Sequence, residues 1–306
     1  MPDSRKLTLS REELEDRGFI TDLTNAIYDY KFIKILRDAP WSQWIETPDG
    51  LRQRSKYLET YKSWIKSSEL CDIEGLDRFK NLDLINGTTQ TFDEAYFKYS
   101  DRRLRIFRGE YGYHRRIAKS WAFLEDEPLS KNDYVIISAP FCSLGDVHPE
   151  YETLLDKAHD LNVPVIVDCA YVGTCEDFSL NVEHPAIESV SFSLSKGAGC
   201  GDIRSGIRFS NISDMNPISQ QNKYNHTVLT AACFGLYVME NLDIDFIPKK
   251  YSKAQKEVCE QIGLQPTKCM HIALANGSEW DNYRVDEKIN RVGIRKLVKS
   301  WEKEEI

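Results

Sequence analysis

The sequence predicts an α/β fold in which a mostly parallel sheet is covered by helices. From about residue 80, short apolar runs alternate with segments whose apolar residues have helical spacing, and this alternation is typical of such folds. Some runs are apolar at nearly every position, as in VPVIV at residues 163–167, which favours strands buried on both faces. The length of 306 residues is enough for a substantial core and favours about two domains.

The first eighty residues are expected to be mainly helical. Residues 11–36 mix apolar and charged side chains, and residues 51–67 (LRQRSKYLETYKSWIKS) carry apolar side chains at helical spacing. The sequence PDG at residues 48–50 is a turn signal that separates these segments. We therefore expect helical stretches before the sheet begins.

The rest of the chain supplies the sheet and a smaller subdomain. Strands are expected at residues 82–85, 104–107, 134–138, 163–167, 188–195 and 203–209. Helices are expected from the loop at 87–89 through residue 99, and at 115–124, 150–161 and about 227–242. A helix at 251–262, a short strand near 271–274 and a polar C-terminal helix are expected to form the subdomain, packed with the N-terminal helices.

Composition excludes several classes of function. The net charge of −8 argues against nucleic-acid binding, which needs clustered Lys and Arg. The eight cysteines form no CxxC pair, which fits reduced thiols in a cytoplasmic protein. The N-terminus has no apolar signal-peptide core, and no run approaches the roughly 18 apolar residues of a membrane span. The six histidines lack metal-ligand spacing, which argues against a metal site. Taken with the charge and the absence of long apolar runs, this predicts no nucleic-acid, membrane or metal partner.

Polar residues follow three of the expected strands. Asp168 ends VPVIVD, Lys196 follows SVSFSLS, and the GTT loop at 87–89 comes after LDLI. In open α/β sheets, ligands bind outside the carboxyl ends of the strands. One edge of the sheet therefore collects an acid, a lysine and a loop that suits a phosphate. A lysine becomes a nucleophile when burial or a nearby cation lowers its pKa, and Arg204 could supply that cation.

The stretch SLSKGAGCGDIRSG at residues 193–206 resembles the lysine motif of the fold-type I enzymes that depend on pyridoxal 5′-phosphate (PLP), the aspartate aminotransferase superfamily. That motif has S-x-[SA]-K, seven further residues, and then R-x-G, and the spacing from Lys196 to Arg204 matches it. The resemblance implies that Lys196 holds PLP as a Schiff base. It covers roughly residues 80–245, and the lysine–arginine spacing is its most specific part.

Other segments resemble the family in the family's order. VPVIVDCAY at 163–171 resembles a strand ending in D-x-[AG]-Y, which implies that Asp168 pairs with the pyridine nitrogen and Tyr171 with the phenolic oxygen of PLP. A carboxylate keeps the ring nitrogen protonated, so that the ring can act as an electron sink. EYGY at 110–113 resembles the aromatic segment in which Tyr111 stacks on the ring. INGTTQ at 85–90 resembles the phosphate loop, so the implied phosphate ligands are Gly87, Thr88, Thr89, Ser193 and Arg204.

One segment departs from the family. SAPFCSLG at 138–145 stands where the family has N-P-x-N-P-T-G. Pro140 and Gly145 fit, but Cys142 takes the place of an asparagine that touches the phenolic oxygen and helps set the pKa of the Schiff base. The departure weighs against ordinary transamination.

The motif residues also have plainer interpretations. Lys196 could be a solvated lysine after an edge strand, and Asp168 could cap a strand end. Ser193 and Lys196 satisfy the S-x-x-K pattern of serine acyl enzymes, but that chemistry needs both on one helical turn, whereas SVSFSLS favours a strand. Tyr111 could be rim packing, and His114 beside it could approach the cofactor. The order of the motifs favours the PLP interpretation.

The resemblance also implies an architecture and an assembly. The expected fold is a three-layer sandwich with a mostly parallel, seven-stranded sheet and a small α+β subdomain, in a homodimer. Residues 1–70 would join the small domain, residues 71–245 would form the PLP-binding large domain, and residues 246–306 would form a reduced small domain. NRVGIR at 290–295 resembles the R-[VIL]-x-[FIL] segment, so Arg291 is the candidate for binding the substrate α-carboxylate.

Three functional hypotheses follow. The first is an aminotransferase acting on an amino acid and a keto acid, with Lys196 as proton shuttle and Asp168 and Tyr171 as its catalytic partners. The second is another PLP reaction in specialised metabolism, such as elimination, decarboxylation, cyclisation or oxidation. The third is a non-catalytic PLP-binding protein, which the intact set of Lys196, Asp168 and Arg204 argues against.

Overall fold

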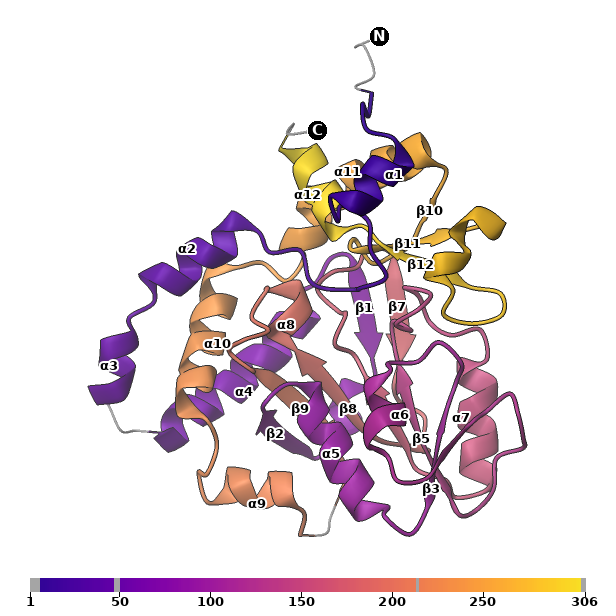
Figure 1. The fold of residues 1–306 in the computed structure, drawn as a ribbon. Helices are drawn as coiled ribbons and strands as arrows, with labels where there is room; N and C mark the ends of the chain where they lie inside the picture. Colours follow the sequence, from indigo (N-terminus) through magenta and orange to yellow (C-terminus); the bar gives the residue numbers. More distant parts are fainter. Residues whose placement is uncertain (1–5, 47–49, 213–214, 304–306) are drawn as a thin grey trace.

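A seven-stranded sheet forms the centre of this computed structural model, which describes residues 6–46, 50–212 and 215–303 (Figure 1). The strand order is β2-β9-β8-β6-β5-β3-β4, and β9 alone runs antiparallel to its neighbours within this sheet. The mostly parallel α/β fold is therefore confirmed. The strands are β2 (Asn81–Ile85), β3 (Arg103–Ile106), β4 (Trp121–Phe123), β5 (Asp133–Ser138), β6 (Val165–Asp168), β8 (Ile187–Ser193) and β9 (Gly206–Ser210).

Helices cover the sheet, and for this reason its middle strands are buried and mostly apolar. β5 and β6 are buried at every position, as their near-continuous apolar runs predict. The longest helix of this region, α4, packs along α10 beside the sheet (Figure 1). The helices around the sheet are α4 (Gly50–Lys66), α5 (Thr88–Lys98), α6 (Tyr113–Ile117), α7 (Tyr151–Asp160), α9 (Pro217–Lys223) and α10 (Leu229–Asn241).

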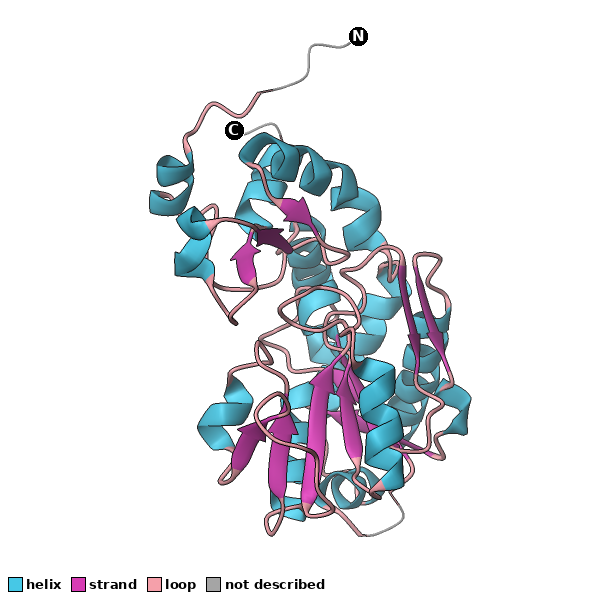
Figure 2. Cartoon of the chain, turned by 90° about the vertical axis from the view of Figure 1, so that its right-hand side faces the viewer, coloured by secondary structure: helices cyan, strands magenta, loops and turns pink. Residues whose placement is uncertain are grey.

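A smaller group of elements lies above the carboxyl end of the sheet (Figures 1 and 2). It contains the antiparallel strands β10 (Gln265–Pro266), β11 (Ile272–Ala275) and β12 (Asn290–Gly293). The helices of this group are α1 (Arg11–Asp16), α11 (Phe246–Ile262) and α12 (Arg295–Glu302). The division at residues 70 and 245 stays a prediction, and α4, which belongs to the first predicted segment, packs on α10 of the second.

Several elements differ from the sequence predictions. The helix predicted over residues 115–124 is wrong: α6 ends at Ile117, and β4 then pairs with β3, with the rings of Trp121 and Phe123 in contact. Residues 11–36 form two helices, because Gly18, with φ of 65°, follows α1, and α2 (Tyr30–Asp38) begins only after its cap Asp29. The sequence did not predict the parallel pair β1 (Cys71–Glu74) and β7 (Phe178–Asn181) or the helix α3 (Trp41–Glu46).

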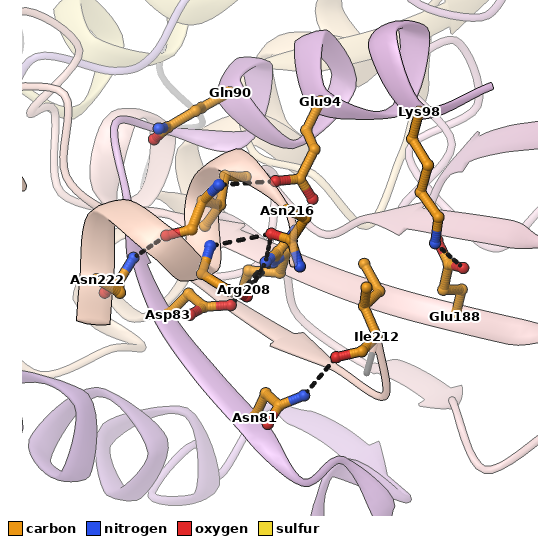
Figure 3. A network of polar contacts seen from close by, with 12 residues as sticks. Asn81, Asp83, Gln90, Glu94, Lys98, Glu188, Arg208, Ile212, Asn216 and Asn222 are labelled. Carbon is orange, nitrogen blue, oxygen red and sulfur yellow. Dashed lines mark hydrogen bonds and ion pairs between the residues drawn. The ribbon is translucent and has the colours of Figure 1, made fainter. Parts of the chain in front are cut away.

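A buried group of charges, which we call the charge network, ties the edge of the sheet to two helices (Figure 3). It consists of Arg208 on β9, Asp83 on β2 and Glu94 on α5. Arg208 Nη2 lies 2.7 Å from Asp83 Oδ2, and Arg208 Nη1 bonds Glu94 Oε1. Asn216, the cap of α9, also accepts a bond from Arg208 (3.1 Å). The network holds β2 and α5 together on either side of the loop at residues 86–87.

Helix α9 completes this edge of the sheet. Asn222 accepts a hydrogen bond from the backbone N–H of Leu84 (2.8 Å) and donates one to the Leu84 carbonyl (2.9 Å). The side chain thus satisfies backbone groups that an edge strand would otherwise leave open. None of the helices within the described ranges combines the length and the apolar character that a membrane crossing requires.

Candidate active site

The predicted site residues converge on one cavity of about 120 Å³ at the carboxyl ends of the parallel strands. Every residue that the PLP motifs implied lines it except Gly87, which stands at the start of α5 beside it. The lining residues are Thr24, Thr88, Thr89, Tyr111, Ser138, Pro140, Cys142, Asp168, Ala170, Tyr171, Ser193, Ser195, Lys196 and Arg204. A larger hollow of about 650 Å³ near β1 is open and brings together none of these residues.

Lys196 lies on a single helical turn rather than directly at a strand end. β8 ends at Ser193, whose side chain caps α8 (Leu194–Gly197). Lys196 Nζ donates a hydrogen bond to the backbone carbonyl of Thr24 (2.7 Å). Burial, and next to it the positive charge of Arg295, lowers the pKa of Lys196 to about 8. The amine is therefore easier to deprotonate than that of an ordinary lysine, which a nucleophilic lysine requires.

The helical turn at Lys196 revives the S-x-x-K alternative, since the expected strand is absent there. The hydroxyl of Ser193, however, bonds Ser195 Oγ (2.7 Å) and the Ser205 carbonyl (3.4 Å). Within the described residues no hydrogen bond joins Ser193 to Lys196, whose amine is bonded to Thr24 instead. The geometry lacks the serine–lysine contact that this chemistry needs.

Asp168 is a buried carboxyl at the end of β6. Its side chain is 7% exposed and accepts a hydrogen bond from the backbone N–H of Ala170 (3.0 Å). Burial, and next to it the charge of Glu110, raises the pKa of Asp168 to about 7. A carboxyl poised near neutrality is unusual for a structural residue and marks this edge of the sheet as a functional site.

Glu110 is a second buried carboxyl that the sequence did not single out. It accepts hydrogen bonds from the Ser138 N–H (2.8 Å), the Ser138 hydroxyl (2.7 Å) and the Tyr111 N–H (2.8 Å). Ser138 is in turn the direct strand partner of Asp168. Burial raises the pKa of Glu110 against the effect of these bonds. The two carboxyls therefore act on each other across the ends of β5 and β6.

The loop before α5 forms an anion-binding corner with Arg204. Gly87 has φ of 76°, and a Cβ there would lie 2.4 Å from Arg204 Nη2, so this position needs glycine. Arg204 Nη2 donates to Thr89 Oγ1 (2.9 Å) and to the Asn86 carbonyl (3.1 Å). The N-terminus of α5, the hydroxyls of Thr88 and Thr89 and a guanidinium thus face one cavity, as a phosphate site requires.

The remaining wall is aromatic on one side and carries Cys142 on the other. Tyr111 lines the cavity with its side chain half exposed and stacks on Tyr113, their ring centroids 6.0 Å apart. Burial raises the pKa of the Cys142 thiol, which donates to the Gly109 carbonyl (3.1 Å). A protonated, hydrogen-bonded thiol is not a nucleophile. Tyr171 bonds the Thr24 hydroxyl through its own hydroxyl (2.9 Å).

Besides Gly87, two residues that the sequence singled out, Arg291 and His114, do not line the cavity. Arg291 donates to the Cys142 carbonyl (3.4 Å), Ser143 Oγ (3.3 Å) and the Asp22 carbonyl (3.1 Å), and its charge acts on Tyr171 and Lys196. Its buried Nε has no hydrogen-bond partner within the described residues. His114 is buried, shares a hydrogen bond with the Tyr96 hydroxyl (2.6 Å) and packs edge-to-face on Tyr111, a residue of the cavity lining, with ring centroids 5.9 Å apart. Arg291 and His114 therefore both adjoin the cavity without lining it, and the approach of His114 to a cofactor stays a prediction.

Beyond Glu110, sequence reasoning missed further residues around Lys196. Thr24 contacts both Lys196 and Tyr171, and Arg295 is the cation that acts most strongly on Lys196. His271 is fully buried against the ring of Tyr171, with centroids 4.6 Å apart, and neither ring nitrogen has a partner within the described residues. No motif surrounds Thr24 or His271 in the sequence, whereas Arg295 ends the NRVGIR segment in which only Arg291 was singled out. In the described ranges no group of three or more His, Cys, Asp or Glu side chains could hold a metal ion.

Comparison with known proteins identifies the fold. No family model matches the sequence, and no curated protein matches it. Among solved structures, similar ones include an aminotransferase from Helicobacter pylori, with a TM-score of 0.63 at 14% identity over 92% of this chain and 91% of the other. The histidinol-phosphate aminotransferase from Clostridium acetobutylicum has a TM-score of 0.61 at 16% identity, over 90% and 95% of the two chains. The PLP-bound C-S lyase from Staphylococcus hominis has a TM-score of 0.59 at 12% identity, over 81% and 82%.

The chain has the fold of these enzymes. The expected fold-type I architecture is therefore confirmed over nearly the whole chain, beyond the residues 80–245 that carry the motifs. At such identities the likeness is one of fold, and function has to be argued from the site itself.

Proposed function

We propose that this protein binds PLP through a Schiff base at Lys196 and acts on an amino-acid substrate. One observation carries the proposal: a single cavity contains a lysine with a lowered pKa, a buried aspartate and an anion-binding corner. Each of these three features suits one part of PLP, namely its aldehyde, its ring nitrogen and its phosphate. The solved structures of this fold include PLP-bound enzymes, which supports the assignment.

The donor set of the cavity fits the cofactor. Asp168 would pair with the ring nitrogen, Tyr171 would donate to the phenolic oxygen, and Tyr111 would cover the ring. The phosphate would be held by Gly87, Thr88, Thr89, Ser193 and Arg204. Cys142 would face the phenolic side, but its thiol is bonded to the Gly109 carbonyl and offers only a weak donor. When bound, PLP supplies a ring that withdraws electrons from the bonds at the substrate α-carbon.

Lys196 is the residue that would move protons. Its pKa of about 8 lies close to neutrality, where a group can both accept and return a proton efficiently. Its amine sits beside Thr24 and Tyr171 in a partly buried position. Arg291 would bind the substrate α-carboxylate, because its guanidinium bonds only neutral oxygens and retains an unused N–H.

Aminotransfer between an amino acid and a keto acid is the reaction that we favour. Aminotransferases recur among the solved structures of this fold, and the set of Lys196, Asp168 and Arg204 is intact. A lyase-type or other PLP reaction is the second candidate, because Cys142 replaces the expected asparagine and a C-S lyase shares the fold. A non-catalytic PLP-binding protein is the third. We also propose a cytoplasmic homodimer with large and small domains divided near residues 70 and 245.

The cofactor assignment has a direct test. The purified protein incubated with PLP should develop a visible absorbance band that borohydride bleaches, and Lys196→Ala should lack it. Lys296→Ala removes an exposed lysine five residues after Arg291 and should keep the band. A wild-type protein that stays colourless with added PLP would overturn the proposal.

The reaction is tested on the loaded protein with a panel of amino acids. Aminotransfer converts the bound cofactor to its amine form and yields one keto acid for each amino acid consumed. Elimination releases ammonia and needs no acceptor keto acid. Ammonia release in place of amine-form cofactor would favour the second candidate, and no change with any amino acid would favour the third.

A further inference from the structure

The segment that connects α1 to α2 passes over the cavity, and we call its residues 22–28 the strap. Its backbone carbonyls at every second residue accept hydrogen bonds from four cations on α8, β12 and α12. The pairs are Asp22 with Arg291 (3.1 Å), Thr24 with Lys196 (2.7 Å), Ala26 with Arg295 (3.3 Å) and Tyr28 with Lys299. The strap is therefore held in a fixed position over Lys196.

Both ends of the strap are anchored. Thr21 exchanges two backbone hydrogen bonds with Gly293 at the end of β12, and a Cβ on Gly293 would lie 2.0 Å from the Leu23 carbonyl oxygen. At the other end the buried carboxylate of Asp29 bonds Lys250 Nζ (2.7 Å) and the Tyr251 hydroxyl (2.6 Å). These contacts fix the strap against the small sheet and α11.

Thr24 is the strap residue whose side chain reaches the site. It lines the cavity, and its hydroxyl lies 2.9 Å from the hydroxyl of Tyr171. Cys142, which stands where an asparagine donor was expected, is bonded to the Gly109 carbonyl. Within the described residues, the Thr24 hydroxyl is thus the hydrogen-bond partner of the Tyr171 hydroxyl, and either oxygen can be the donor.

We propose that Thr24 is a positioning residue that donates its hydroxyl proton to Tyr171, so that Tyr171 keeps its own proton for the phenolic oxygen of PLP. The inference rests on the proposed function and goes beyond it by assigning a role to the strap. A tyrosine hydroxyl has one proton to donate, and accepting a bond from Thr24 both orients that proton and strengthens the bond it makes. The threonine would thus compensate in part for the missing asparagine.

The proposal predicts a shift in a titration. Once the imine nitrogen loses its proton, the phenolic oxygen carries more negative charge, and a strong donor from Tyr171 stabilises that form. Removing the Thr24 hydroxyl should therefore raise the pH at which the imine loses its proton. The other titratable or charged groups that face Lys196 and Tyr171 stay unchanged in this comparison: Asp168, Cys142, His271, Cys269, Arg291 and Arg295.

The test uses the visible absorbance of the PLP-loaded protein as a function of pH. Thr24→Val keeps the shape and the backbone carbonyl but removes the hydroxyl, and should raise the midpoint by about 0.5–1 pH unit, the size of one hydrogen bond. Thr24→Ser should restore the wild-type midpoint. Thr153→Val makes the same chemical change at an exposed position of α7 and should leave the midpoint of the titration unchanged.

A double-mutant cycle shows whether Thr24 acts through Tyr171. Tyr171→Phe should raise the midpoint by itself, and Thr24→Val added to it should have no further effect. Thr24→Ala serves if the valine variant fails to fold. An unmoved midpoint in the variants without the hydroxyl, or an equal shift in the Tyr171→Phe background, would overturn the inference. A wild-type protein without any visible band would instead overturn the proposed function.

Discussion

Two groups of buried charges belong to the same sheet, and they are built in opposite ways. In the charge network, Arg208 faces two carboxylates, Asp83 and Glu94, and an additional amide oxygen (Figure 3). In the cavity, Lys196 bonds a neutral carbonyl and Asp168 a backbone N–H, and within the described residues neither has an ion-pair partner. A buried charge with its counter-charge serves the fold, whereas one without it is held ready for a ligand.

The arginines of the molecule show the same difference. Arg105 is fully buried and pairs with Asp133 (2.8 Å) while donating to three backbone carbonyls. Arg291 instead bonds only neutral oxygens at 3.1–3.4 Å and has no carboxylate partner in the described structure, although the Nε of both arginines lacks a hydrogen bond there. Burying a charge without a counter-charge costs free energy, so a protein keeps such charges where function requires them.

The largest expected effect comes from breaking the charge network. Arg208→Met should leave Asp83 and Glu94 as uncompensated buried charges and lower the free energy of unfolding by about 3–5 kcal/mol, measured by urea denaturation of the PLP-free protein. Arg116→Met, at an exposed position, is the control and should change it by about 0.5 kcal/mol or less. A similarly small loss for Arg208→Met would mean that the network is not structural.

A substitution of Asp168 in the cavity should instead raise the free energy of unfolding. Asp168 has a pKa of about 7 in the folded protein against a usual value of 3.8, so the folded state disfavours its charge. Below about pH 4 the carboxyl is protonated in both states and costs nothing, and above about pH 7 the full cost is present. Asp168→Asn should therefore raise the free energy of unfolding of the PLP-free protein by about 4 kcal/mol at pH 8.

The pH dependence makes this expectation specific. The gain from Asp168→Asn should fall to less than half when the urea denaturation is repeated at pH 5, because the wild-type carboxyl is then mostly protonated in the folded state. Asp160→Asn, on the exposed end of α7, should show no such gain. Destabilisation by Asp168→Asn at pH 8 would place Asp168 with the structural charges.

The sequence predicted some parts of the fold and of the cavity and missed others. The strands β5 and β6 and the lysine motif were predictable, because apolar runs and a fixed Lys196–Arg204 spacing are local signals. Thr24 was not, because it meets Lys196 across 172 residues of sequence and lies in a segment without helix or strand. The edge strand β4 was missed for a related reason: its three residues acquire their conformation by pairing with β3.

The smallest expected effect concerns Cys142. This residue is as buried as the residues of the core, yet it also lines the cavity. Cys142→Asn would introduce an amide N–H where the thiol is a weak donor. If that N–H reaches the phenolic oxygen, it should lower the midpoint of the visible titration of the PLP-loaded protein by about 0.5 pH unit, opposite to Thr24→Val. Cys142→Ser keeps a short donor toward the Gly109 carbonyl and should leave the midpoint in place. An unchanged midpoint in Cys142→Asn would mean that the amide bonds the Gly109 carbonyl or Glu110 instead, and that the tyrosine–threonine pair alone supplies donors on this side of the cofactor.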